Sequence, residues 1–495
     1  MLEKIREFFV NLNQDEIRYC HWKSNLGLPE ALTGETDIDI LIARKDAVRY
    51  RAILSQLGFQ PAVLKSVESY PSVEHHFALD TGSGILVHVH SYYRVITGES
   101  LAKNYRFPIE EMLLENRRQE GMVYVPTASA ELLVFTLRIM MKHTSLMELL
   151  LLSRDWKQVK REVIWLLESA SVEETIAFAA DWMPALDGDL LRSCIEAIKK
   201  PASLMQRIRL GNRIRAQLHL YGRNSAMRAW GNEVKKFSIM LYRRLTGSKL
   251  GMIPQSGGAV IAFVGSEATG KSTLLAEIKS WLGEHFEVEQ VHAGKPKSTA
   301  ITLLPNVLLP ALRRLLPSLR SSRVATSASA KPAAAQKQSN FPLLFGIRSV
   351  SLAYDRRALL SKAYQLAANG TIVLCDRYPS KETGAPDSPQ LTALEETETA
   401  SSPDRSLRAR LTHLEHKFYR EIPPPDLVIY LTAPLEITIA RNANRGKYEP
   451  EDFVRLRHAQ SSNLQFNKTT VYKINTDQPF EETLMEVKKA IWNAL

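Results

Sequence analysis

The spacing of hydrophobic residues divides the chain into stretches that predict different elements. Up to about residue 125, short apolar runs typical of strands, such as Ile38–Ala43 and Gly84–His90, alternate with helical segments. From about Thr127 to Leu245, large apolar residues recur every three or four positions, as in amphipathic helices. From Ala259 onward, strand-like runs and helical patterns alternate, which predicts a parallel α/β sheet. We therefore expect a multidomain α/β protein with an α+β domain at 1–125, a helical connector domain at 126–250 and an α/β domain at 258–495.

Polar stretches interrupt this pattern. Ser318–Asn340 is rich in Ser, Ala, Lys and Gln, and we expect a mobile, basic surface loop there. Ser380–Pro403 follows a strand and is expected to be either an active-site lid or an insertion. The basic stretch Lys235–Lys249 is expected to be a solvated helix face that leads into a linker.

Composition limits the location and the partners. The chain has 495 residues, of which 45% are hydrophobic, enough for several packed cores. Single, widely spaced cysteines exclude a disulfide framework and a Cys-rich zinc module, and they fit a reducing cytoplasm: Cys20, Cys194 and Cys375. The charged N-terminus argues against export, and charges within the apolar stretch Glu131–Ser153 argue against a membrane span.

The net charge of +11 suits an anionic partner, which leaves nucleotide phosphates, nucleic acid and anionic lipid open. No stretch interleaves aromatic and basic residues as RNA-binding segments do, so nucleic acid is the minor interpretation. We expect a cytoplasmic protein that handles a small phosphorylated molecule, and a homodimer is a further possibility.

A phosphate-binding loop is predicted between the strand-like run Ala259–Val264 and the helical run Leu274–Leu282. The glycines let consecutive backbone N–H groups point at phosphate oxygens, and the helix N-terminus adds a favourable dipole. The order of strand, Gly-x4-Gly-Lys-Ser loop and helix is that of a phosphate-binding P-loop, and we expect it to bind ATP with Mg²⁺. Lys271 is expected to contact the β and γ phosphates, and Ser272 to bind Mg²⁺. The predicted ATP-binding residues are Gly265, Ser266, Glu267, Ala268, Thr269, Gly270, Lys271, Ser272 and Thr273.

A second candidate site follows the buried strand-like run Thr371–Cys375, which ends in Asp376 and Arg377. Ligands of open α/β sheets lie beyond the carboxyl ends of the strands, so both side chains should lie beside the phosphate loop. Taken alone, such a pair is more often a structural ion pair than a site.

The order of motifs in the C-terminal part resembles that of thymidylate kinases. These motifs are Tyr354-Asp-Arg356-Arg357, Gly370, Asp376-Arg377-Tyr378, Pro425–Leu431, Glu436 and Arg441-Asn-Ala-Asn-Arg445-Gly-Lys447. The resemblance implies a P-loop NTPase domain with three α/β/α layers and a parallel sheet. It also implies that Asp376 acts near Mg²⁺ and the attacking group, and that Arg356 and Arg377 hold the acceptor's phosphate.

The same resemblance makes Arg441 and Arg445, four residues apart on a predicted helix, candidates for a catalytic arginine on a closing lid. A solvated basic helix face is the alternative for both arginines. Where thymidylate kinases carry an Arg-Glu-Pro-Gly-Gly-type segment, this chain has Val291–Lys297, which leaves the acceptor open. A nucleoside monophosphate is the first acceptor to expect. A hydroxyl compound, a sugar or glycan-precursor phosphate, and an ATP-driven switch without acceptor are the alternatives.

The N-terminal stretch His21–Asn25 followed by Gly34–Ile42 resembles the nucleotidyltransferase superfamily that includes DNA polymerase beta. Asp37 and Asp39 would share one face of a strand and could bind Mg²⁺ with a nucleotide. The resemblance implies a third carboxylate on a later strand, where this chain has His88. We therefore expect binding without transfer. A transition-metal site is the less favoured alternative for His75, His76, His88 and His90.

Overall fold

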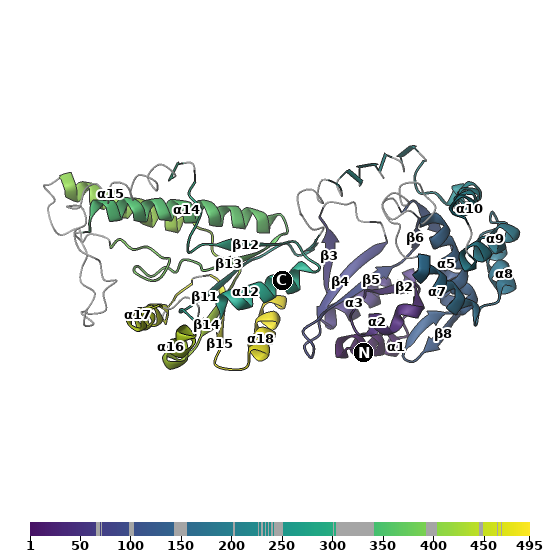
Figure 1. The fold of residues 1–495 in the computed structure, drawn as a ribbon, viewed down its shortest axis with the longest axis horizontal. Coiled ribbons are helices and arrows are strands. Elements are labelled where there is room, and N and C mark those ends of the chain that lie inside the picture. The colour runs from purple at the N-terminus through teal and green to yellow at the C-terminus, as the bar shows by residue number, and fades with distance from the viewer. Residues whose placement is uncertain are drawn as a thin grey trace. The chain divides into compact units, whose positions relative to one another are not determined.

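The computed structural model folds the chain into two compact units, Met1–Leu250 and Gly251–Leu495 (Figure 1). The structure describes residues 1–65, 70, 72–98, 103–142, 156–200, 203–225, 227–228, 231–232, 234–235, 237–238, 241, 251–299, 301–302, 341–392, 403–444, 449–462, 464–466 and 468–495. The predicted loop Ser318–Asn340 and most of Lys235–Lys249 lie outside these residues.

The first unit contains a mixed sheet whose strands run in the order β1 (Tyr19–His21), β2 (Ile38–Ile42), β5 (Leu86–Tyr92), β4 (Val73–Leu79) and β3 (Gln60–Leu64). Only the β2–β5 pair among these is parallel. The helices α1 (Glu3–Gln14) and α3 (Ala47–Gln56) contribute apolar side chains to one core of this unit, including Phe8, Phe9 and Tyr50. Shorter elements complete the α+β part: η1 (Asn25–Gly27), α2 (Leu28–Leu32), η2 (Arg44–Asp46), β6 (Val95–Thr97), β7 (Tyr105–Phe107), α4 (Glu110–Glu115), β8 (Arg117–Glu120) and β9 (Val123–Pro126).

The helices of the first unit follow the predicted apolar spacing. They are α5 (Ala128–Lys142), α7 (Trp156–Leu167), α8 (Val172–Trp182), α9 (Gly188–Lys199) and α10 (Leu204–Gln217), followed by η3 (His219–Tyr221). In α9, for example, Leu190, Leu191, Cys194, Ile195 and Ile198 are buried. This helical core also includes Trp22 and Tyr92 from the α+β part. The two parts therefore share a core, and the predicted division at residue 125 stays a prediction.

The second unit contains a five-stranded sheet in the order β12 (Val288–His292), β13 (Ile372–Asp376), β11 (Val260–Gly265), β14 (Leu427–Thr432) and β15 (Thr470–Asn475). Every neighbouring pair in it is parallel. The central strands are apolar up to their last residues because helices cover both faces. The predicted multidomain α/β class with a parallel sheet is thus confirmed.

The helices of this unit are α12 (Lys271–Gly283), α14 (Leu343–Ala368), α15 (Pro403–Arg420), α16 (Leu435–Ala443), α17 (Glu451–Ser461) and α18 (Phe480–Trp492), and a short strand, β10 (Met252–Pro254), precedes β11. In Figure 1, α14 and α15 run along one face of the sheet, and α12 and α18 lie along the other. Leu360, Ala363 and Ala367 of α14 pack on side chains that alternate along the strands, such as Val260 and Ala262. This sandwich fixes the strand ends that carry the candidate site.

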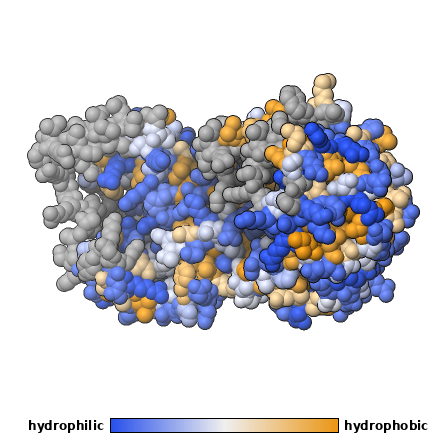
Figure 2. Space-filling model, turned by 45° about the vertical axis from the view of Figure 1, so that its right-hand side comes forward, coloured by the Kyte–Doolittle hydropathy of each residue, from blue (hydrophilic) through white to orange (hydrophobic). Residues whose placement is uncertain are grey.

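Hydrophilic residues prevail on the face drawn in Figure 2, and hydrophobic ones form small groups between them. A search of the described residues finds no helix that is both long and apolar enough to span a bilayer. The apolar stretch Glu131–Ser153 begins within α5, and its residues from 143 onward lie outside the described part of the chain.

Candidate functional site

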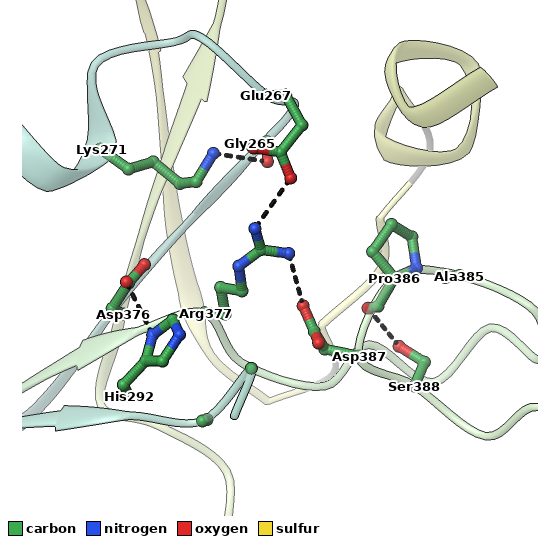
Figure 3. A network of polar contacts seen from close by, with 12 residues as sticks. Gly265, Glu267, Lys271, His292, Asp376, Arg377, Ala385, Pro386, Asp387 and Ser388 are labelled. Carbon is green, nitrogen blue, oxygen red and sulfur yellow. Dashed lines mark hydrogen bonds and ion pairs between the residues drawn. The ribbon is translucent and has the colours of Figure 1, made fainter. Parts of the chain in front are cut away.

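The candidate site lies where three parallel strands end. Gly265 is the last residue of β11, Asp376 the last of β13 and His292 the last of β12. The register places Phe263 opposite Asp376 and His292 opposite Asp376. Figure 3 shows how the side chains that follow these strand ends point toward one another. Asp376 and Arg377 therefore follow a strand that neighbours the one leading into the glycine loop, as the sequence predicts.

The loop from Gly265 to Gly270 has the backbone conformation that its glycines predict. Gly265 has a φ of 145° and Gly270 a φ of 85°, and Ala268 adopts a φ of 60° between them. Lys271 then begins α12. Positive φ is uncommon for a residue other than glycine, so Ala268 marks local strain of the kind that collects at binding sites.

Replacing Gly265 by alanine is expected to destabilise the second unit by about 3 kcal/mol, because two penalties add. A Cβ there would lie 2.3 Å from the carbonyl oxygen of Leu431, and the φ of 145° disfavours a side chain. Gly283→Ala is the matched control, since no atom lies within 4 Å of its added Cβ. Urea denaturation of both variants measures the difference, and equal midpoints would contradict the prediction.

Lys271 folds back over the loop. Its Nζ donates hydrogen bonds to the carbonyl oxygens of Gly265, at 3.1 Å, and Ser266, at 2.5 Å, and the residue is buried. Thr269 is also buried, and its hydroxyl donates to the Ser266 carbonyl. The ammonium group thus lies within the loop whose N–H groups would meet phosphate oxygens.

Arg377 links this loop to a later segment. Its Nη2 lies 2.8 Å from Oε1 of Glu267, and its Nη1 lies 3.1 Å from Oδ2 of Asp387 (Figure 3). Arg377 itself has a φ of 72°, which turns the chain sharply after β13. Glu267 is one of the predicted loop residues, and its pKa is lowered: burial alone would raise it, but Arg377 and Lys271 outweigh that effect.

Asp376 and His292 form a pair across neighbouring strand ends. His292 Nδ1 lies 2.7 Å from Oδ2 of Asp376. The Asp376 carboxylate is partly buried, whereas His292 is 44% exposed. His292 belongs to the segment Val291–Lys297 that departs from the thymidylate kinase pattern, so the departure brings an imidazole to the carboxylate predicted to be catalytic.

Arg356 lies on α14 and is 3% exposed. Its guanidinium donates to the carbonyl oxygen of Ala293 at 2.8 Å, to the Tyr419 hydroxyl at 2.6 Å and to Asp387 at 2.7 Å. The structure therefore brings Arg356 to the same carboxylate as Arg377. Its predicted contact with an acceptor stays a prediction.

Of the two predicted lid arginines, the structure describes Arg441. Arg441, on α16, donates from Nη1 to the hydroxyl of Thr476 at 3.0 Å and from Nη2 to its carbonyl at 2.7 Å. Arg445 lies outside the described residues. A catalytic part for either arginine stays a prediction.

The residues expected to hold Mg²⁺ in this unit fit such an ion chemically. Ser272 is exposed in the first turn of α12 and supplies a hydroxyl oxygen, and Asp376 supplies a carboxylate from the neighbouring strand end. Mg²⁺ prefers hard oxygen ligands and keeps several waters. The pair is therefore compatible with an ion that also contacts phosphate oxygens.

Two candidate functional residues were not predicted from the sequence. His292 and Asp387 lie in segments interpreted as a departure from the family and as an insertion. The described part of the second segment, 380–392, packs tightly, with Ser380, Ser388 and Leu391 buried. The one local signal was Pro386-Asp387, a pair typical of turns.

The first unit has its own polar cluster on the β2–β5 strands. His88 Nδ1 lies 2.7 Å from Oδ1 of Asp37, and His90 Nδ1 lies 3.2 Å from Oδ1 of Asp39. Lys23 Nζ also donates to Asp39 at 2.6 Å. Burial alone would raise the pKa of Asp39, but Lys23 and His90 hold it well below its ordinary value.

This donor set does not fit a pair of magnesium ions. Imidazole replaces the third carboxylate at His88, and imidazole is a poor ligand for Mg²⁺. Both carboxylates already accept hydrogen bonds. Asp37 and Asp39 as magnesium ligands therefore stay a prediction, and no metal-dependent step follows from them.

Two histidines of this cluster, His75 and His90, stack on each other. The ring centroids of His75 and His90 lie 4.2 Å apart, and burial lowers the pKa of His90 to about 4. Among the described residues, no group of three or more His, Cys, Asp or Glu side chains is arranged to hold a metal ion. The transition-metal alternative gains no support from the residues described.

Glu131 on α5 is a buried carboxylate in the same unit. Its carboxylate accepts from the backbone N of Asn25 at 2.9 Å and from Nδ2 at 2.7 Å. Burial raises the pKa of Glu131 to about 7, although these hydrogen bonds oppose the shift. Between its unfolded pKa and about 7, the folded chain holds a proton that the unfolded chain releases, so this stabilising contribution is lost as pH rises through 7.

We therefore expect the unfolding free energy of the wild type to fall by up to about 3 kcal/mol between pH 5 and pH 8 because of Glu131. In Glu131→Gln this part of the fall should be absent. The glutamine stays neutral and keeps an oxygen acceptor for Asn25. Urea denaturation at both pH values measures the fall, and Glu168→Gln, at an exposed position, is the control. The same fall in wild type and Glu131→Gln would contradict the expectation.

Comparison with known proteins gives distant relatives. No protein-family model matches the chain. Two relatives from Escherichia coli, of strain K12 and of the O6:H1 strain CFT073, both carry the name "Uncharacterized ATP-binding protein YghR". Each is 27% identical over 237 residues, which cover 47% of this chain and 86% of the relative. The chain is thus similar to proteins described as ATP-binding, at an identity that does not show a family.

A solved structure of an unliganded sugar kinase from Janibacter sp. HTCC2649 also matches. It is 14% identical, with a TM-score of 0.24, over 47% of this chain and 94% of the kinase chain.

Proposed function

We propose that this protein is an ATP-dependent phosphotransferase, with a thymidylate kinase-like P-loop domain in its second unit. The observation that carries the proposal is the position of Asp376 and Arg377 at the end of β13, next to the loop Gly265–Ser272 at the end of β11. In-line transfer of a phosphoryl group needs a phosphate cradle, a fixed cation and a carboxylate within one small volume. The site offers all of these.

Each group of the site would have a separate role in phosphoryl transfer. Backbone N–H groups of the glycine loop and Lys271 bind the β and γ phosphates, and Arg377 orients the acceptor side of the site. Mg²⁺, held by Ser272 with Asp376 nearby, would neutralise phosphate charge. The name of the Escherichia coli relatives supports nucleotide binding.

For the first unit we propose a nucleotidyltransferase-like fold that binds a ligand without transferring a nucleotide. Support comes from Asp39 on β2 and Asp37 directly before it, and from the imidazole of His88 in place of a carboxylate. Resemblance to thymidylate kinases makes a nucleoside monophosphate the first acceptor to test, followed by sugar or glycan-precursor phosphates.

The test is ADP release by the full chain with ATP and Mg²⁺, across nucleoside monophosphates, sugar phosphates, nucleosides and sugars. Lys271→Ala serves as the inactive control. Release that depends on one acceptor and disappears in the control would support a kinase. Slow release that no acceptor accelerates would instead identify an ATP-driven switch and contradict the proposal.

A further inference from the structure

Asp387 bridges the two arginines of the acceptor side. One carboxylate oxygen lies 2.7 Å from Arg356 Nη2, and the other lies 3.1 Å from Arg377 Nη1. Glu267 accepts a hydrogen bond from Nη2 of Arg377 at 2.8 Å. Two guanidinium groups therefore meet two carboxylates, and this part of the site carries no net charge.

The segment that carries Asp387 is anchored at several points. The backbone N of Ser380 donates to the Ser388 hydroxyl at 2.8 Å, and Gly384 N donates to the Pro389 carbonyl at 2.7 Å. The backbone N of Leu391 donates to the Glu415 carboxylate at 2.8 Å. Asp387 is thus held in place by its own loop, with a φ of 61°.

Burial makes displacement of Asp387 costly. Its side chain is 11% exposed and that of Arg356 is 4% exposed. A phosphate that took both arginines from Asp387 would leave a buried carboxylate unpaired beside a dianion, which is strongly unfavourable. Arg356 also donates hydrogen bonds to the Ala293 carbonyl and the Tyr419 hydroxyl. The arginine pair is therefore arranged to hold Asp387.

We propose that Asp387 is a specificity-determining residue that excludes a phosphate from the arginine pair, and that the acceptor is an uncharged hydroxyl compound such as a sugar or a nucleoside. This inference rests on the proposed phosphotransferase function. The acceptor's hydroxyl oxygen forms a bond to the γ-phosphorus while the bond from that phosphorus to the β–γ bridging oxygen breaks. ADP leaves with that bonding pair, and the hydroxyl proton passes to the Asp376 carboxylate.

The test compares molecules that differ by one phosphate: thymidine with thymidine 5′-monophosphate, and glucose with glucose 6-phosphate. Calorimetry on the full chain, with MgADP at saturation, gives the affinity for each. In wild type, the phosphate is expected to improve affinity by less than about threefold. In Asp387→Asn, which removes the negative charge between the two guanidiniums, the phosphate is expected to improve it by about tenfold or more, the gain typical of a charge-assisted pair.

Asp452→Asn is the matched control, because it removes the same charge at an exposed position on α17. A tenfold preference of wild type for either phosphorylated molecule would overturn the inference, as would an Asp387→Asn variant with unchanged preference. If that variant does not fold, ADP release by wild type decides: faster release with the unphosphorylated molecules supports the inference, and faster release with the phosphorylated ones overturns it. Failure of MgADP to bind would contradict the proposed function instead.

Discussion

Replacing Lys271 by alanine is expected to lower kcat/KM for phosphoryl transfer from ATP by about 10²–10³-fold, the usual effect of losing one preorganised donor to a charged transition state. The Lys271 Nζ lies within hydrogen-bonding distance of two loop carbonyls, so a short rotation would bring it to phosphates seated on the loop. No other residue from the loop itself supplies a cation. Loss of the ammonium should also weaken ATP binding, because a charge-assisted contact disappears.

Steady-state ADP release and ATP calorimetry together measure this effect. Lys279→Ala is the matched control, since it lies on the exposed face of the same helix and removes the same charge. Unfolding midpoints of both variants should stay close to wild type, which separates lost chemistry from lost fold. A Lys271→Ala protein that kept more than a tenth of wild-type kcat/KM would contradict the assigned contact.

The elements around the phosphate loop were predictable because their signals are local. The apolar run of β11, the glycine spacing and the helical period after Lys271 lie within about two dozen residues. Glycine permits positive φ without steric penalty, and the structure has positive φ at Gly265 and Gly270. The strand Ile372–Asp376 also carries its signal locally, as a buried apolar run that ends in charge.

The acceptor side was not predictable, because its contacts join residues far apart in sequence. Asp387 lies ten positions after Arg377 and 31 after Arg356. Nothing in a polar segment reveals that its turn brings one carboxylate between two guanidiniums. The packing of that segment onto Glu415, a residue of α15, decides the geometry. Such ion pairs follow from tertiary structure and produce no periodic pattern in the sequence.

The first unit shows the same limit. A period of two along an extended chain predicts that Asp37 and Asp39 share a face, and in the structure both side chains contact imidazoles. Which imidazoles they meet depends on the parallel register of β2 and β5, in which Asp39 lies opposite His90. Sequence alone fixes neither the parallel direction nor that register.

Changing Asp376 to asparagine is expected to lower kcat by about 10²–10³-fold, within the range typical of a lost general base. The amide keeps the shape of the side chain but can neither accept a proton from the attacking group nor carry charge toward Mg²⁺. Its position at the end of β13 favours both roles. Rates measured over a series of Mg²⁺ concentrations separate them: saturating Mg²⁺ restores the rate if the carboxylate serves mainly as a ligand, and leaves it low if the carboxylate serves as the base.

His292→Gln is the companion variant, because it removes the imidazole 2.7 Å from Asp376 and leaves the carboxylate in place. If the imidazole only orients the carboxylate, its loss should lower kcat about tenfold, which is less than the effect of losing the carboxylate itself. The same rank order should hold for every acceptor, since neither group touches the Arg356–Asp387 side of the site in the contacts described. Asp376→Asn activity within threefold of wild type would remove Asp376 from the chemistry and leave the Asp376–His292 pair a structural one.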